Sequence, residues 1–187
     1  MNAATGKGPG NWIPYFLAGL QAGMMGAWGM LLWMGFSAMW MGRSFWSAEN
    51  IMATVLKGDA AIRPGFGSGT PVGIALYLAI YSLLGAGFAV AVRRRLTGLG
   101  GVLVGILGAL GWYYLFFRVL ALQAMPLVWL LHTERPTQFG HVVFGVMAAR
   151  FPAYLPRAQA PVEVPGQAPP ERLAPPGEPG AVDSGTP

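Results

Sequence analysis

Residues 12–41 read WIPYFLAGLQAGMMGAWGMLLWMGFSAMWM and carry no charged side chain. A helix of about 20 apolar residues is long enough to cross the hydrocarbon core of a bilayer. This stretch is longer than that minimum, so the helix must tilt or extend beyond the hydrocarbon. Trp12 lies at one end and Trp40 at the other, where indole rings anchor helices at membrane interfaces. The segment therefore predicts a first membrane helix.

Working outward from this segment, the same reasoning predicts further membrane helices over 72–92 and 99–121. A fourth is expected over 137–155, although its uncharged core, 139–149, is too short to span alone. Arg150 would then have to extend its side chain to the interface. Pro126 and the polar turn 132–136 separate the third helix from the fourth.

A shorter helix is predicted between the first two membrane helices, over 44–57. Ser44 is a suitable N-cap, and apolar residues recur after it at helical spacing. Glu49, Asn50 and Lys57 lie elsewhere on the helical wheel. This pattern is typical of an amphipathic helix that lies in the membrane interface or packs over the bundle.

These elements together predict an all-α integral membrane protein. Its core is a four-helix transmembrane bundle within 12–157, preceded by a polar, glycine-rich arm over 1–11. The remaining tail, 158–187, is rich in proline and has few large apolar side chains, so we expect an extended segment.

The composition supports this class and excludes several others. Of the 187 residues, 54% are hydrophobic and only 10% are charged, against about 25% charged residues in an ordinary soluble domain. The chain has no cysteine, which excludes disulfides, thiolate metal sites and a cysteine nucleophile. The net charge of +5 comes from basic residues beside apolar runs, so we expect no nucleic-acid partner.

Basic residues also predict the orientation. The amino-terminal arm, the segment after 72–92 and the carboxyl-terminal segment would share one side of the membrane, and they carry Lys7, Arg93, Arg94, Arg95, Arg150, Arg157 and Arg172. The opposite side would carry Arg43, Lys57, Arg63, Arg118 and Arg135. The positive-inside rule then places both termini in the cytoplasm, with the bundle in a bacterial inner membrane.

Glycines suggest an internal repeat. Two predicted helices carry glycines at the same spacing of four, three and three: Gly19, Gly23, Gly26 and Gly29 in the first, and Gly101, Gly105, Gly108 and Gly111 in the other. The next helices begin with similar motifs, Thr-Pro-Val-Gly73 and Thr-Gln-Phe-Gly140. Two tandem two-helix units would explain both matches. The spacing favours a close-packing stripe for another helix, and a groove for a lipid, quinone or (bacterio)chlorophyll ring is the alternative.

Two polar side chains stand out within the apolar segments. His141 could ligate a heme iron or chlorophyll magnesium; the alternative is a histidine that bonds a neighbouring helix or interfacial water. Arg118 ends a long uncharged run, and ionisable residues at membrane depth are often functional. Near a helix end, however, its side chain can reach the interface, and Glu49 and Glu134 are its candidate partners. No metal site and no firm cofactor follows from the sequence.

The sequence contains no set of residues typical of an enzyme. We find no paired carboxylates, no serine–histidine–acid set and no phosphate-binding loop. The leading hypothesis is a non-catalytic accessory or structural subunit of a larger membrane complex of respiratory or photosynthetic type. Its partners would be membrane lipids and other integral membrane subunits. A small stand-alone carrier or channel that uses Arg118 is one alternative, and a cofactor binder that uses His141 is the other.

Overall fold

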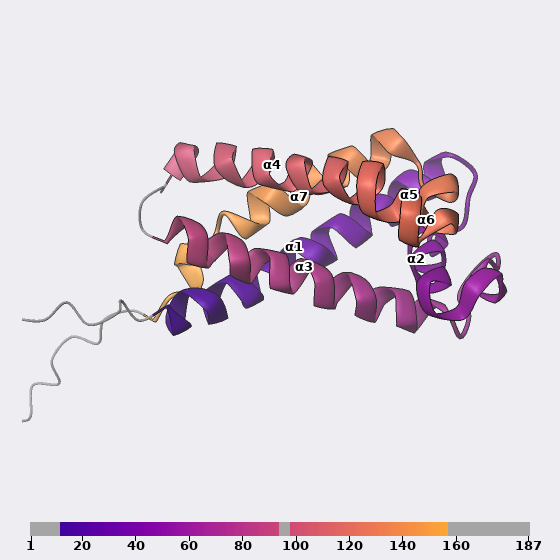
Figure 1. Cartoon of the computed structure of the whole chain (residues 1–187), viewed down its shortest axis with the longest axis horizontal. Coiled ribbons are helices and arrows are strands. Elements are labelled where there is room, and N and C mark those ends of the chain that lie inside the picture. Colours follow the sequence, from indigo (N-terminus) through magenta and orange to yellow (C-terminus); the bar gives the residue numbers. More distant parts are fainter. Residues whose placement is uncertain (1–11, 94–97, 157–187) are drawn as a thin grey trace, which may run out of the picture. The chain divides into compact units, whose positions relative to one another are not determined.

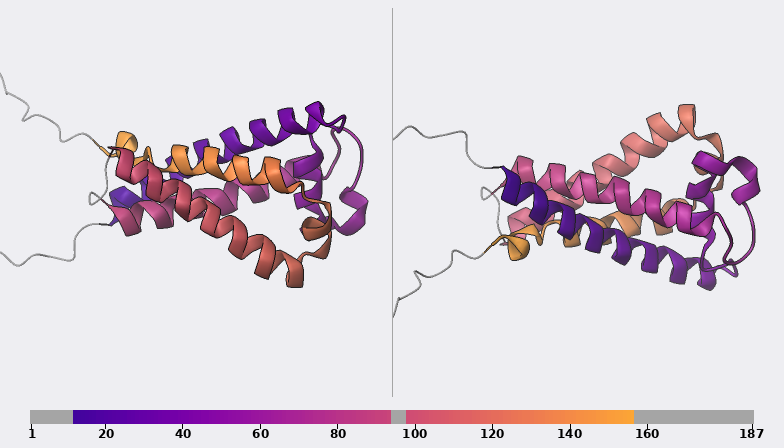
Figure 2. Two further views of the ribbon diagram at one scale, coloured as in Figure 1. Left: turned by 90° about the horizontal axis from the view of Figure 1, so that it is seen from above. Right: turned by 90° about the horizontal axis from the view of Figure 1, so that it is seen from below.

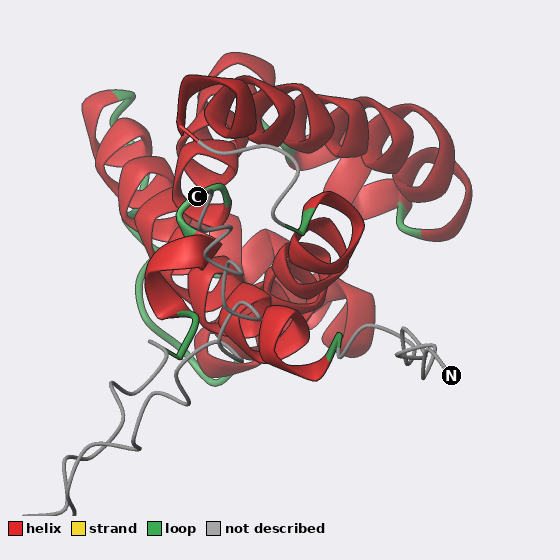
Figure 3. Ribbon diagram, turned by 90° about the vertical axis from the view of Figure 1, so that its left-hand side faces the viewer, coloured by secondary structure: helices red, strands yellow, loops and turns green. Residues whose placement is uncertain are grey.

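A computed structural model describes residues 12–93 and 98–156, and these residues form helices joined by short loops (Figures 1 and 3). The predicted arm over 1–11 and the tail over 158–187 lie outside the described residues, so neither prediction is tested. Within the described part, three helices are long and apolar enough to cross a membrane: Ile13–Trp40, Thr70–Val92 and Gly98–Ala124. These candidate spans indicate a multi-pass membrane protein.

Fewer than half of the residues in the most apolar window of each span are buried inside the bundle. In the most apolar window of each span, the buried share is 44%, 28% and 28% of the residues. The outward surface includes large side chains such as Trp28, Phe36, Leu83 and Leu107, each more than a third exposed. Such a surface has no favourable place in water, but it matches a hydrocarbon solvent.

The first two long helices form a crossed pair. Helix α1, Ile13–Trp40, begins with a proline in its first turn, where the missing N–H costs no hydrogen bond. Helix α3, Thr70–Val92, also has a proline in its first turn. It returns antiparallel across α1 (Figure 1). The expected boundaries of 12–41 and 72–92 are confirmed to within two residues.

Helix α2, Ser47–Lys57, lies between α1 and α3 in the sequence and covers one end of the pair. It is followed by a 3-10 turn, η1, Gly58–Ala61. The predicted polar face of this helix is wrong: Glu49 and Asn50 are 1% and 3% exposed, whereas Leu56 is 67% exposed. The reason is that α2 packs its Glu49 side against α3 at Gly73, where a Cβ would collide with the main chain of Glu49.

The third span is interrupted near its end. Helix α4, Gly98–Leu115, passes into a π-helical segment, η2, Phe116–Leu120, and then into α5, Ala121–Ala124. Pro126 starts the short helix α6, Pro126–Leu131. The span therefore continues three residues beyond the predicted end at 121. The break lies at Met125, because a proline disfavours helical backbone in the residue that precedes it.

The last long element is α7, Glu134–Ala148, followed by a 3-10 turn, η3, Phe151–Tyr154. The expected fourth helix therefore starts three residues earlier, because the first turn of a helix accepts Pro136. Helix α7 lies between α1 and α4 (Figures 1 and 2). Phe151 of η3 packs near Tyr15 at the start of α1. The described chain thus begins and ends at one end of the bundle, but α7 is too short to count as a candidate span.

Candidate functional site

Glycines allow α1 and α3 to touch main chain to main chain. A Cβ on Gly23 would lie 2.5 Å from the carbonyl oxygen of Tyr81, and one on Gly19 would lie 2.5 Å from that of Gly85. A Cβ on Gly85 would in turn meet the main chain of Gly23 at 2.6 Å. These two α1 glycines therefore have a packing role against α3, as in other small-residue helix crossings.

The other two glycines of the same stripe face a different helix. A Cβ on Gly26 would lie 2.8 Å from the ring of Phe144, and one on Gly29 would lie 3.3 Å from a methyl of Val143. Phe144 and Val143 belong to α7. The predicted stripe of α1 is therefore divided between two neighbours, which fill it with a backbone on one side and large side chains on the other.

The matching glycines of α4 are only partly covered. Gly105 meets Gly145 of α7 so closely that a Cβ on Gly105 would lie 2.5 Å from the carbonyl oxygen of Gly145. Gly101 is also buried. In contrast, a Cβ on Gly108 or Gly111 would have no atom of the described residues within 4 Å, and both glycines are exposed.

A groove runs beside Gly108, between α3 and α4, and its smaller part is also lined by Phe144 and Ala148 of α7. Its wider part has a volume of about 440 Å³ and its side branch about 120 Å³. Leu84, Phe88 and Trp112 line both parts, and Gly108 lies in the branch. None of the described residues that line either part is charged, so the groove suits hydrocarbon or an apolar helix face.

His141 lies inside the bundle and both of its ring nitrogens have partners. The residue is fully buried. Nδ1 lies 2.8 Å from the Thr137 carbonyl, and Nε2 lies 2.8 Å from the Tyr81 hydroxyl. A carbonyl can only accept, so Nδ1 carries the proton and Nε2 accepts from Tyr81. A metal could bind Nε2 only if the Tyr81 hydroxyl moved away, so the arrangement favours the alternative of a histidine bonded to a neighbouring helix.

Aromatic rings surround this pair. Tyr81 stacks on Tyr77 at 5.7 Å between centroids, and Tyr113 of α4 meets the His141 ring edge-to-face at 5.2 Å. Phe144 approaches Tyr81 at 4.9 Å. The cluster joins α3, α4 and α7 and leaves the imidazole enclosed by side chains.

Arg118 has the partner that the sequence suggested, but at the surface. It lies in the π-helical segment, and one of its guanidinium nitrogens is 3.5 Å from a carboxylate oxygen of Glu134. The two side chains are 65% and 61% exposed. Glu49, the other candidate partner, does not pair with it. An ion pair this exposed contributes little to folding stability, and neither charge is buried in the bundle.

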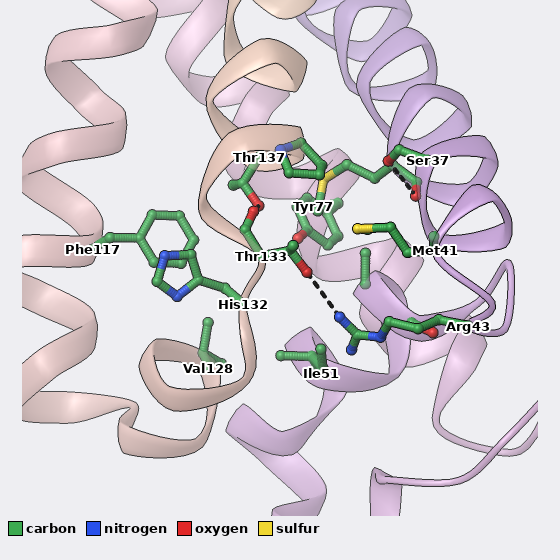
Figure 4. Close-up of a pocket in the computed structure, with 15 residues that line it drawn as sticks. Ser37, Met41, Arg43, Ile51, Tyr77, Phe117, Val128, His132, Thr133 and Thr137 are labelled. Carbon is green, nitrogen blue, oxygen red and sulfur yellow. Dashed lines mark hydrogen bonds between the residues drawn. The ribbon is translucent and has the colours of Figure 1, made fainter.

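A narrow cavity lies where α1 ends, between α2, α6 and the start of α7 (Figure 4). Its volume is about 30 Å³, which is room for roughly two water molecules. Arg43 lies at its rim and donates a hydrogen bond of 2.8 Å to the Thr133 hydroxyl. His132 lines the cavity from the other side and stacks on Phe117 at 4.1 Å between centroids.

The same end of the bundle holds two buried atoms without hydrogen-bond partners among the described residues: Oε2 of Glu49 and Nε2 of His132. Burial raises the pKa of the Glu49 carboxyl from 4.5 to about 7. Both polar atoms of the neighbouring Asn50 side chain have hydrogen-bond partners. The amide nitrogen donates to the main-chain carbonyls of Arg63 and Gly65, and the amide oxygen accepts from the Thr70 hydroxyl.

Arg43 and His132 did not emerge from the sequence as site residues, and Glu49 emerged only as a candidate partner of Arg118. Each sits near a helix end, where a polar residue is expected to be solvated. Only the packing of α2 and α6 over the end of α1 brings Arg43 and His132 to one cavity and buries Glu49. The weak signal was the two polar residues, Glu49 and Asn50, inside an otherwise helical apolar pattern.

Comparisons of this chain with protein-family models, with curated proteins and with solved structures gave no match.

Proposed function

We propose that this chain is a non-catalytic accessory subunit of a larger complex in a bacterial inner membrane, and that the face of α4 around Gly108 binds a transmembrane helix of a partner subunit. The observation that carries the proposal is the contrast between Gly108 and Gly111 and their counterparts in the repeat. Gly26 and Gly29 receive side chains of α7, whereas no residue of 12–93 or 98–156 lies over Gly108 and Gly111.

The chemistry of this face suits a helix as the occupant. Exposed glycines let a neighbouring backbone approach closely, and van der Waals contact drives helix association in a membrane. The adjacent groove is lined by apolar side chains of α3 and α4, so a partner helix buries no unpaired polar group there. A helix with a bulky aromatic side chain would reproduce the contact that Phe144 makes with Gly26.

The carrier alternative receives less support. It requires a charge that a substrate or ion can use inside the bundle, whereas Arg118 is exposed and paired with Glu134. The cofactor alternative requires a ligating nitrogen on His141, and both nitrogens already have protein partners.

The proposed orientation keeps both termini in the cytoplasm with α7 as a fourth crossing. It is supported by the common end at which α1 begins and η3 ends (Figure 2). Helix α7 reaches this end beside α1, although it is less apolar than the three candidate spans. Its polar residues Thr137 and His141 are buried against other helices rather than turned to lipid, which removes the cost of exposing them to hydrocarbon.

The test is the replacement of Gly108 and Gly111 together by leucine in the native host. Within the part of the chain that the structure describes, no atom opposes the new side chains, so the isolated chain should fold normally. The wild-type chain should migrate on a native gel with other membrane subunits, and the double variant should migrate alone. Gly100→Leu is the matched control, because Gly100 on the same helix also has open space around it.

Three results would contradict the proposal. One is a wild-type chain that purifies in mild detergent as a solitary monomer. Another is a double variant that keeps the same co-migrating subunits. The third is an assembly that contains only copies of this chain, which would identify the α4 face as a self-association surface instead.

A further inference from the structure

A second pocket, separate from the cavity beside Arg43, lies where the end of α4, the π-helical segment η2, α6 and the start of α7 meet. Its volume is about 240 Å³, eight times that of the cavity beside Arg43. This volume is a little below the range of about 300–1,000 Å³ that is typical of drug-sized ligand sites. The pocket therefore has room for a small polar group that is much larger than water.

Four aromatic side chains form one wall of this pocket, namely Tyr113, Phe117, Trp129 and His132. The His132 ring stacks on Phe117 at 4.1 Å between centroids, and Tyr113 approaches Phe117 at 5.0 Å. The Trp129 carbonyl accepts a hydrogen bond of 2.6 Å from Nδ1 of His132. Trp129 is 38% exposed, whereas Tyr113 and Phe117 are 3% and 5% exposed. The wall therefore offers mainly the indole, which is the best aromatic partner for a cation.

Two opposite charges line the same pocket, those of Arg118 and Glu134. Both charges interact electrostatically with the Tyr113 hydroxyl, which belongs to the aromatic wall. One guanidinium nitrogen lies 3.5 Å from one carboxylate oxygen, and within residues 12–93 and 98–156 neither charge has another ionic partner. A long, exposed ion pair is weak. The other N–H groups of Arg118 and the second oxygen of Glu134 are thus free for a ligand that carries both an anion and a cation.

The position of Arg118 along its span places this pocket at the headgroup level of a membrane. Arg118 lies 20 residues after Gly98, where the span begins. At 1.5 Å per residue this separation is about 30 Å, which is the thickness of the hydrocarbon core. Leu115, Val119 and Leu122, on the turns beside Arg118, are 48%, 45% and 49% exposed. These apolar side chains suit acyl chains, while the arginine reaches the polar interface.

We propose that this pocket binds the zwitterionic headgroup of a phospholipid that carries a phosphate and a primary ammonium. The Arg118 guanidinium binds the phosphate. The Glu134 carboxylate accepts hydrogen bonds from the ammonium, and the Trp129 indole stabilises the same cation. A purely anionic headgroup would leave the carboxylate beside a like charge. The site shares no residue with the α4 face around Gly108, so it does not depend on the chain being an accessory subunit.

Native mass spectrometry of the full chain in detergent tests the proposal with two lipids that have the same acyl chains. Phosphatidylethanolamine carries the phosphate and the ammonium, whereas phosphatidylglycerol carries the phosphate alone. The net charge of +5 attracts the anionic lipid, so long-range attraction opposes the preference that we propose. We expect the first molecule of phosphatidylethanolamine to bind about fivefold more tightly. Equal binding, or tighter binding of phosphatidylglycerol, would overturn the proposal.

Variants of the two charges then locate the site. Glu134→Gln should abolish the preference, because it removes the partner of the ammonium. Arg118→Gln should weaken both lipids about fivefold and leave the preference, because both carry the phosphate. Arg135→Gln is the matched control, since Arg135 is exposed on the next residue and does not line the pocket. An unchanged preference in Glu134→Gln, or equal losses in Arg118→Gln and Arg135→Gln, would contradict the assignment.

Folding and the source of the zwitterion need separate arms. If Glu134→Gln does not fold, as judged by its circular dichroism, Trp129→Leu leaves both charges in place and should halve the preference. An unchanged preference in Trp129→Leu would then contradict the proposal. Free phosphoethanolamine has the same two charges but no acyl chains, and at millimolar concentration it should not displace the bound lipid. Displacement would identify a site for a soluble zwitterion, and the lipid assignment would fail.

Discussion

The helix pairs α1–α3 and α4–α7 both cross at closely packed glycines, but they differ in the elements that cover them. Each pair crosses antiparallel at glycines, with Gly23 against Gly85 in one pair and Gly105 against Gly145 in the other. Gly23 and Gly105 are the positions that the repeat aligns. The second alignment, Gly73 with Gly140, is not reproduced as a contact, since Gly73 faces α2 and Gly140 faces Met30 of α1.

The pairs also differ in what covers them. Helix α1 has neighbours on both sides of its glycine stripe, whereas α4 packs closely on α7, touches α3 only slightly and leaves Gly108 and Gly111 bare among the described residues. The first connection buries Glu49 and Asn50; the second carries the exposed ion pair of Arg118 and Glu134. A common helix-pair plan therefore fixes the crossings, and the connections and outer faces are free to diverge.

Gly85→Leu and Gly145→Leu should have the largest effect, because each side chain would meet the main chain of the opposing helix. We expect loss of the folded state in both variants, a cost above about 4 kcal/mol, since the helices cannot separate without opening the core. Thermal unfolding in detergent measures the effect. A folded Gly145→Leu beside an unfolded Gly85→Leu would show that the second pair is held by something other than its crossing.

Asn50→Ala should come next, because three hydrogen-bond partners in the first connection lose their counterpart. We expect a cost of about 2–4 kcal/mol from buried groups left unpaired. Urea unfolding of the detergent-solubilised chain gives the value. A loss below about 1 kcal/mol would mean that water replaces the amide and that this connection is no better fixed than the second.

His141→Ala tests the polar contact inside the core. We expect a cost of about 2–3 kcal/mol, from the lost hydrogen bond to Tyr81 together with the cavity left behind. Tyr81→Phe should cost about half as much, because it removes only the hydroxyl. The same unfolding experiment serves here, and a purified wild-type chain with a visible absorption band that disappears in His141→Ala would instead support cofactor ligation.

Glu49 gives the first connection a pH dependence. Because the carboxyl has a raised pKa of about 7 in the folded chain, the folded state binds the proton more tightly than the unfolded state. Stability is therefore greatest below about pH 4.5 and falls as the pH rises to about 7, by about 1–3 kcal/mol. Glu49→Gln should remove most of this slope. An identical pH profile in wild type and variant would show that the carboxyl is solvated.

The smallest effects should come from the second pair's outer surface. Gly108→Ala should leave the isolated chain unchanged or stabilise it by up to about 1 kcal/mol, because alanine favours helix and meets no neighbour. The measurement is thermal unfolding in detergent, compared with the Gly85→Leu and Gly145→Leu variants. A destabilisation above about 1 kcal/mol would mean that α3 closes over this face in solution.

Arg118→Met should cost less than about 1 kcal/mol, as expected for an exposed ion pair. The measurement is the midpoint of urea unfolding at low and high salt. If the variant lost more than this, the second connection would be as closely fixed as the first, and the contrast between the two would not hold.

Hydrophobicity by itself was enough to locate the long helices, because lipid imposes a length and an absence of charge that can be read residue by residue. The same patterns placed α1 and α3 within two residues of their ends. Gly23 and Gly105 were likewise marked by their spacing alone. These are local properties, so a one-dimensional pattern contains them.

Only the tertiary structure decided which glycines are covered, that Glu49 and Asn50 are buried, and that Arg43 and His132 line one cavity. Those facts depend on the approach of α7 to α1 and of α2 to α3, which are contacts between residues far apart in the chain. A helical wheel gives the direction of a side chain from its own axis but not the neighbour it meets. The amphipathic pattern of α2 therefore misassigned its polar face, because the space beneath it was enclosed by α3 rather than open to water.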